Sequence, residues 1–179
     1  MHILDIANNS TRALAKTVTL EVTADFVRDV LTVAITDDGH GMDEELLKRL
    51  SDPFATTRTT RRVGMGIPLY RMAAENSGGS LQIESKLGKG TRVTATFKIS
   101  HIDRPPLGDM AETVITMIGG APETDFTFIY RTDAGAYEFC TKAVKDALGE
   151  DDLSDVTVLL YLKDLIDENV KNLNGGNHI

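Results

Sequence analysis

The chain has 179 residues, which suits one domain or one domain with an appended piece. Its apolar and charged fractions are ordinary for a globular protein, and its formal net charge of −8 argues against a nucleic-acid or anionic-membrane surface. The single cysteine, Cys140, excludes an internal disulfide framework. No apolar run approaches the ~18 residues of a membrane span, and no signal peptide opens the sequence, so we expect a cytoplasmic protein.

Residues 1–15 predict a helix, because apolar or small side chains recur there at helical spacing: Ile3, Ile6, Ala7, Ser10 and Leu14. Asp5 and Asn9 are four residues apart and therefore project from the same face of that helix. This polar pair either simply faces solvent or belongs to a site. In a site, Asn9 would offer its amide oxygen to Mg²⁺, and Asp5 would orient a water or accept a proton.

Residues 17–24 and 30–36 alternate apolar and polar side chains and predict an antiparallel hairpin. Asp37 follows directly, and Gly39 and Gly41 come within the next four residues. Such glycines let the backbone approach a flat ligand, and the Asp37 carboxylate could accept a hydrogen bond from the amine of adenine. The alternative is a tight turn closed by an Asx hydrogen bond.

A short helix over residues 44–50 is predicted next, with Asp43 as its cap. Residues 56–63 have no hydrophobic period and predict a loop. Arg58, Arg61 and Arg62 lie together in this loop without an acidic residue between them. The cluster is either a solvated loop or part of an anion site.

Gly64 and Gly66 precede a predicted helix over residues 67–76, with Leu69, Met72 and Ala73 expected to face inward. A glycine-initiated helix start presents free N–H groups and favours an anion. Close packing of the backbone explains the two glycines equally well.

Residues 81–85 and 92–99 predict a second strand–turn–strand unit. The first hundred residues therefore predict an α+β fold. We expect a two-layer sandwich with the helices on one face of a mixed, mainly antiparallel sheet.

Four motifs in a fixed order resemble the GHKL superfamily, which includes gyrase, heat-shock chaperone ATPases, histidine kinases and mismatch-repair ATPases. Residues 5–10 resemble its N box, residues 37–41 its G1 box, residues 63–67 the latter part of its G2 box and residues 88–91 its G3 box. Residues 52–58 are similar to the F box and the start of the ATP lid. The resemblance covers residues 1–100 and implies the Bergerat fold.

The resemblance implies ATP and Mg²⁺ as cofactors, with Asp37 at adenine, Asn9 at the metal and Asp5 as the catalytic carboxylate. The implied nucleotide-binding residues are Asn9, Asp37, Gly39, Gly41, Met42, Phe54, Thr57, Arg58, Gly64, Met65, Gly66, Ile67 and Thr91. Two positions depart from the family pattern. Asp5 replaces the usual Glu and is one methylene shorter, and Arg62 replaces the first G2 glycine.

Residues 101–179 predict a linker and a small α+β extension that carries no recognisable motif. Residues 101–110 form the linker, 111–118 a helix, 126–130 and 136–140 a hairpin. Thr141 is expected to cap a short helix that stops at Gly149, and Ser154 to start a long helix. A stripe on that long helix is expected to face the core: Leu159, Leu162, Ile166, Val170 and Leu173.

Two chemistries of the superfamily compete for this sequence. One passes the γ-phosphoryl group of ATP to a partner protein, and the other uses hydrolysis to drive a conformational switch. The shorter side chain of Asp5 argues more strongly against the hydrolysis hypothesis than against the kinase hypothesis, because phosphoryl transfer depends mainly on positioning and charge neutralisation. The chain lacks a phosphoacceptor histidine motif, so the acceptor would be another protein. A non-catalytic ATP-sensing module is the third hypothesis, and a homodimer is compatible with the sequence.

Overall fold

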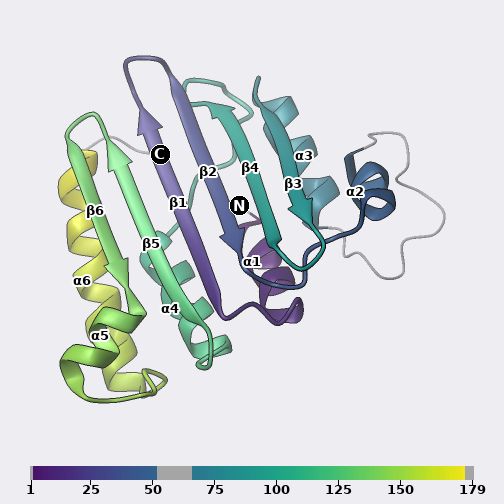
Figure 1. Ribbon diagram of the computed structural model, residues 1–179. Coiled ribbons are helices and arrows are strands. Elements are labelled where there is room, and N and C mark those ends of the chain that lie inside the picture. The colour runs from purple at the N-terminus through teal and green to yellow at the C-terminus, as the bar shows by residue number, and fades with distance from the viewer. Residues whose placement is uncertain (1, 52–65, 176–179) are drawn as a thin grey trace.

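The structure, a computed structural model, describes residues 2–51 and 66–175 (Figure 1). In chain order the helices and strands are α1 Ile3–Arg12, β1 Thr17–Asp25, β2 Val30–Asp37, α2 Glu44–Ser51, α3 Gly66–Asn76, β3 Ser80–Lys86, β4 Gly90–Lys98, α4 Met110–Gly120, β5 Asp125–Thr132, β6 Gly135–Cys140, α5 Thr141–Leu148 and α6 Val156–Asn174.

The six strands form one sheet in the order β3-β4-β2-β1-β5-β6. Of the strand pairs that the structure describes, β1 and β5 are parallel, with Leu20 opposite Phe128, and the others are antiparallel. The chain can enter β5 parallel to β1 because α4 carries it back across the sheet, as a parallel connection requires. The predicted mixed, mainly antiparallel sheet is confirmed.

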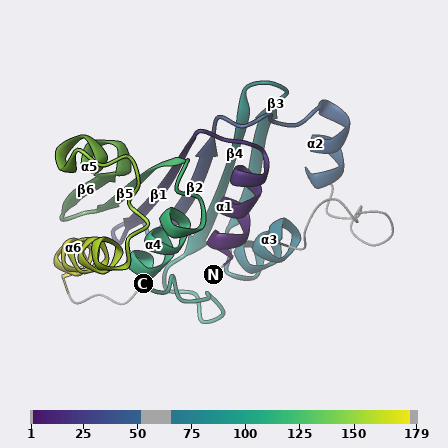
Figure 2. The same ribbon diagram turned by 90° about the horizontal axis from the view of Figure 1, so that it is seen from below.

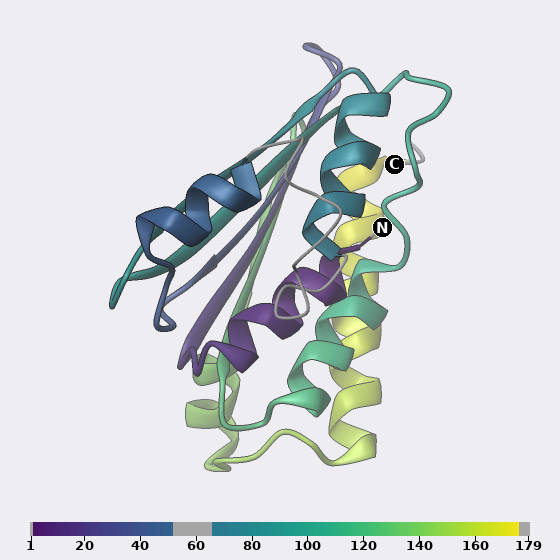
Figure 3. The ribbon, with the colours of Figure 1, turned by 90° about the vertical axis from the view of Figure 1, so that its right-hand side faces the viewer.

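Helices α1, α3, α4 and α6 cover one face of the sheet (Figure 3). Helix α2 lies beside β3 at one edge, and α5 and α6 lie on either side of the end of β6 at the other edge (Figure 2). The sandwich predicted for the first hundred residues is thus continued by the last two strands, which extend the same sheet.

One hydrophobic cluster runs through the described residues and joins both ends of the sequence. It includes Ile6 from α1, Val22 from β1 and Phe128 from β5, each at most 2% exposed. The stripe predicted on α6 packs against it: Leu162 and Ile166 are buried, and the other three members are partly buried. The prediction that this stripe faces the core is confirmed. None of the described helices is both long enough and apolar enough to cross a membrane.

Two expected inward side chains prove to be exposed. Leu14 is 82% exposed because α1 ends at Arg12 and the backbone of Leu14 adopts a positive φ of 58°. Met72 is 53% exposed because α3 turns Ile67, Tyr70 and Ala74 toward the core instead.

The predicted starts of α5 and α6 differ from the structure by one or two residues. Cys140 holds the N-cap position of α5, and the Thr141 hydroxyl accepts the Phe126 N–H at 2.8 Å. Asp155, rather than Ser154, caps α6 by accepting the N–H of Thr157. In contrast, Asp43 accepts the Leu46 N–H at 2.8 Å, which confirms the predicted cap of α2.

Candidate functional site

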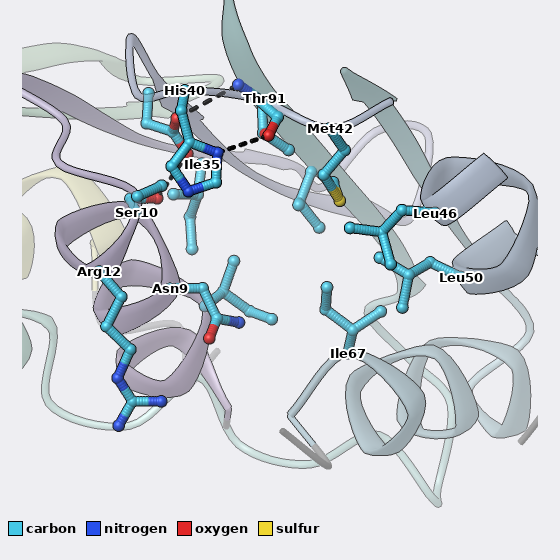
Figure 4. A pocket seen from close by; sticks show the side chains of 15 residues that line it. Asn9, Ser10, Arg12, Ile35, His40, Met42, Leu46, Leu50, Ile67 and Thr91 are labelled. Carbon is cyan, nitrogen blue, oxygen red and sulfur yellow. Dashed lines mark hydrogen bonds between the residues drawn. The ribbon is translucent and has the colours of Figure 1, made fainter. Parts of the chain in front are cut away.

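A cavity of about 310 Å³ opens between α1, the end of β2, α2 and the start of α3 (Figure 4). One side is apolar and presents Met42, Leu46, Leu50 and Ile67. The other side is polar. Its lining residues, besides Asp37, are Asn9, Ser10, Arg12, His40 and Thr91. A cavity with one apolar wall and a few convergent polar groups suits a ligand that has a flat apolar body and polar edges.

Asp37 lines this cavity and is 9% exposed. Its Oδ1 accepts the N–H groups of Gly39 at 3.0 Å and Thr91 at 3.2 Å. Its Oδ2 accepts the Ser10 hydroxyl at 2.7 Å. The bond to Gly39 is the Asx turn expected as the alternative, so the carboxylate both closes a turn and faces the cavity. Each carboxylate oxygen offers two lone pairs, which leaves Oδ2 able to accept one further hydrogen bond.

The loop after Asp37 is held tightly against the β3–β4 turn. Gly88 donates its N–H to the His40 carbonyl at 2.7 Å, and Met42 donates its N–H to the Ser85 hydroxyl at 2.9 Å. Gly41 has a φ of +64°, and a Cβ there would lie 2.2 Å from the Lys86 carbonyl oxygen. Gly41 is therefore required by this close approach, whatever it does for a ligand.

Gly41→Ala is expected to lower the free energy of unfolding by about 3 kcal/mol, since it combines a strained φ with a backbone collision. Gly88→Ala is the matched control, because Gly88 has a φ of +73° in the same turn region and nothing within 4 Å of an added Cβ. This control should lose only about 1 kcal/mol, the cost of the left-handed conformation. Urea unfolding of both variants measures the difference, and equal losses would contradict the collision.

Asp38 supports the same loop from outside the cavity. Its Oδ1 accepts the N–H groups of Lys16 at 2.7 Å and Thr17 at 2.9 Å. Burial works against ionisation of this carboxyl, but the hydrogen bonds from Thr17 and Lys16 outweigh it and hold the pKa of Asp38 below its ordinary 3.8.

A carboxyl with a lowered pKa in the folded state stabilises the fold above its unfolded pKa and loses that contribution as pH falls through the folded pKa. Asp38→Asn keeps a carbonyl acceptor for both N–H groups but removes the ionisation. We therefore expect wild type to exceed Asp38→Asn in unfolding free energy at neutral pH and the gap to narrow below pH 3.8. Urea unfolding at both pH values checks this, and a constant gap would contradict it.

Helix α1 places Asn9, Ser10 and Arg12 along the cavity. The Asn9 side chain points toward its open middle, and Arg12 lies at the rim (Figure 4). Asp5, one turn before Asn9, is not among the lining residues. Its side chain is 58% exposed and lies 3.2 Å from the His2 ring nitrogen Nδ1. Asp5 also lies against the first residue of α3, because a Cβ on Gly66 would come 2.8 Å from the Asp5 Cβ.

Gly66 thus allows α3 to begin directly beside α1. Ile67 lines the cavity, and Pro68 lies in the first turn, where its missing N–H costs nothing. Of the two explanations for Gly64 and Gly66, an anion site or close packing of the backbone, close packing therefore holds for Gly66. The other predicted residues of this region lie outside the described residues: Phe54, Thr57, Arg58, Gly64 and Met65.

The structure brings together six of the predicted residues around the cavity: Asn9, Asp37, Gly41, Met42, Ile67 and Thr91. Gly39 and Gly66 lie next to it. Sequence reasoning missed Ser10, Arg12, Leu46 and Leu50 as lining residues. The signals were available, because Arg12 is three residues after Asn9 and the two leucines share a face of α2 at a spacing of four. Ser10 was assigned only to the core, and it both packs there and holds Asp37.

A two-layer α/β fold with such a cavity between its first helix and its α2–α3 region is the arrangement of a histidine-kinase-like ATP-binding domain. The family model described as histidine kinase-, DNA gyrase B-, and HSP90-like ATPase matches residues 2–101. The chain belongs to this family, whose domains bind ATP.

Curated relatives include the histidine protein kinase DivJ of Caulobacter vibrioides, which is 31% identical over 101 residues, 54% of this chain and 17% of that protein. Sporulation kinase D of Bacillus subtilis is 28% identical over 98 residues, 55% of this chain and 19% of that protein. Sensor histidine kinase ZraS of Escherichia coli O157:H7 is 26% identical over 106 residues, 59% of this chain and 23% of that protein. The chain therefore spans less than a quarter of each.

Among solved structures, the crystal structure of the N-terminal domain of a DNA repair protein aligns with a TM-score of 0.50 and 12% sequence identity. The alignment covers 78% of this chain and 50% of that one. At this identity the likeness shows the fold alone, and it is consistent with the predicted Bergerat fold.

Proposed function

We propose that the cavity binds Mg²⁺–ATP and that Asp37 accepts a hydrogen bond from the adenine amine. The observation that carries this proposal is a buried Asp37 in the lining of a half-apolar cavity, with three hydrogen bonds fixing its carboxylate. These donors are all supplied by the protein, so the carboxylate is held as an acceptor. The apolar wall formed by Met42, Leu46 and Ile67 would cover the adenine ring.

The triphosphate would extend toward Asn9 and the start of α3. ATP brings about four negative charges, which an acidic chain must neutralise locally. The first turn of a helix has N–H groups without partners inside the helix and carries the positive end of the dipole, and α3 starts beside the cavity, where Arg12 at the rim adds a cation. The Asn9 amide oxygen is the hard ligand type that Mg²⁺ prefers, and the ion, when bound, neutralises phosphate charge. The residues that line the cavity therefore fit both ATP and Mg²⁺.

The reaction we propose is transfer of the γ-phosphoryl group to a side chain of another protein. The acceptor nitrogen or oxygen would form the new bond to phosphorus, the bond to the ADP oxygen would break, and the acceptor would release its proton. The kinase names of the relatives support this proposal. The shorter side chain of Asp5, one methylene less than the family's usual Glu, also supports it, because phosphoryl transfer depends mainly on positioning and charge neutralisation whereas hydrolysis must activate a water.

Incubation of the chain with γ-labelled ATP and the proteins encoded beside its gene tests the proposal. Label on one of those proteins is the expected result. If the chain alone released free phosphate and Asp5→Asn lost this activity, the result would contradict the kinase proposal and favour an ATP-driven switch. Tight ATP binding without either product would leave an ATP-sensing module. The boundary near residue 100, the homodimer and the cytoplasmic location stay predictions.

A further inference from the structure

A second apolar groove, of about 680 Å³, lies at the opposite end of the sheet from the ATP cavity. It is formed by β6, α5 and α6, the two helices that flank the end of β6 (Figure 2). All of this lies beyond residue 101, where the family match ends. The groove therefore belongs to the part of the chain that the family does not account for.

The groove follows the free edge of β6. Four consecutive residues of this strand, 137–140, line it. Neighbouring residues of a strand point to opposite faces, so a groove that touches all four lies along the strand's edge and not on one face. β6 is the last strand of the sheet, and no strand among the described residues pairs with its outer side. Such an edge offers unpaired backbone groups to an incoming chain.

The helices beside this edge leave large apolar side chains in solvent. Tyr161 of α6 is 68% exposed, Leu148 of α5 is 54% exposed and Leu165 of α6 is 37% exposed, and all three line the groove. Single exposed apolar residues are normal on a protein surface, but a set that shares one groove indicates a binding surface.

The segment that forms the groove is strongly acidic. Residues 138–168 contain nine carboxylates and three lysines, which gives −6 of the chain's net charge of −8. Two of those lysines are already paired with carboxylates outside the segment, Lys145 with Asp125 and Lys163 with Glu112. Of the nine carboxylates, Asp167 is paired with Lys171, and the segment keeps an excess of negative charge beside a groove whose lining is mainly apolar.

The negative charge of this segment distinguishes between the kinds of ligand that could bind in the groove. A second copy of the chain would bring the same acidic groove and would be repelled. A fatty acid or anionic lipid would also bring like charge. A segment of another protein with apolar residues flanked by lysine or arginine matches both the groove and its surroundings. We infer that such a basic-flanked apolar segment of a partner protein binds here, lying along the outer edge of β6.

This inference does not rest on the proposed function, since the groove is formed by β6, α5 and α6, whereas the ATP cavity is lined by residues of α1, β2, α2, α3 and β4 and shares no lining residue with it. Selection of a displayed library of random peptides on the full chain tests it. We expect the enriched peptides to combine apolar residues with flanking lysine or arginine, and their affinity to fall with rising salt. Tyr161→Glu should weaken the selected peptides about tenfold or more, since it places a charge inside the groove.

Leu160→Glu is the matched control, because Leu160 is the neighbouring residue on α6, is 56% exposed and does not line the groove. It should bind the selected peptides as wild type does, and both variants should bind ATP as wild type does. Failure to enrich any peptide, enrichment of acidic peptides, or equal effects of the two variants would overturn the inference. A concentration-dependent dimer that Tyr161→Glu abolishes would also overturn it, by making a second copy the occupant.

Discussion

Asp37→Asn is expected to weaken ATP binding about 10- to 100-fold, the cost of a lost hydrogen bond to a charged group. The N–H groups of Gly39 and Thr91 both donate to Oδ1, so an asparagine there must turn its amide oxygen toward them. Its NH₂ group then takes the place of Oδ2, near Ser10 and the cavity. A donor would thus meet the adenine amine, which is also a donor. Isothermal titration calorimetry with ATP measures the loss.

Asp38→Asn is the control for this experiment, since Asp38 is the next residue, carries the same side chain and accepts hydrogen bonds from Lys16 and Thr17 outside the cavity. It should leave ATP affinity unchanged at neutral pH. Unchanged ATP affinity in Asp37→Asn would contradict the proposed contact between Asp37 and adenine. Equal losses in both variants would instead indicate that the loop has been displaced.

Asn9→Ala is expected to abolish the effect of Mg²⁺ on this chain. We expect Mg²⁺ to strengthen ATP binding by wild type and to have no such effect on the variant, because the variant lacks the amide oxygen proposed to hold the ion. Transfer of label to the partner protein should fall about 100-fold or more with it. ATP binding in the presence of a chelator should be unchanged, since the adenine contacts are intact.

Asn8→Ala provides the comparison, because Asn8 is on the same helix, is exposed and does not line the cavity. It should respond to Mg²⁺ as wild type does. If Mg²⁺ still strengthened ATP binding by Asn9→Ala, the ion would be held by ligands other than Asn9. Loss of ATP binding by Asn9→Ala under chelation would mean that Asn9 contacts the nucleotide itself.

The sequence alone identified the family and most of the fold. Alternating residues predicted β1, β2, β3 and β4, since strand periodicity is a local property. The motif at residues 37–41 predicted a carboxylate at the end of a strand, and in the structure Asp37 is the last residue of β2, with its Asx bond to Gly39. The predicted starts of α5 and α6 differ from the structure by one or two residues, because helix ends are less regular than helix interiors and a periodic pattern does not locate them more closely.

The tertiary structure decided how the last third of the chain is used. No local pattern predicts that β5 pairs in parallel with β1, since the two strands are separated by about a hundred residues and such pairing depends on contacts far apart in sequence. Burial of Phe126, Phe128 and Tyr130 in the common core follows from that pairing.

The proposed ATP cavity and the groove at β6 also differ in how much of each the sequence could predict. Sequence motifs identified an ATP-binding domain and predicted that Asp37, Asn9 and Thr91 belong to its site, and the structure has all three in the lining of one cavity. Only the folded chain brought Leu50 of α2 to the same cavity as Ser10 and Arg12 of α1, because the packing of the two helices sets their distance. The groove at β6 could not be predicted at all, since it exists only where β6 ends the sheet between α5 and α6.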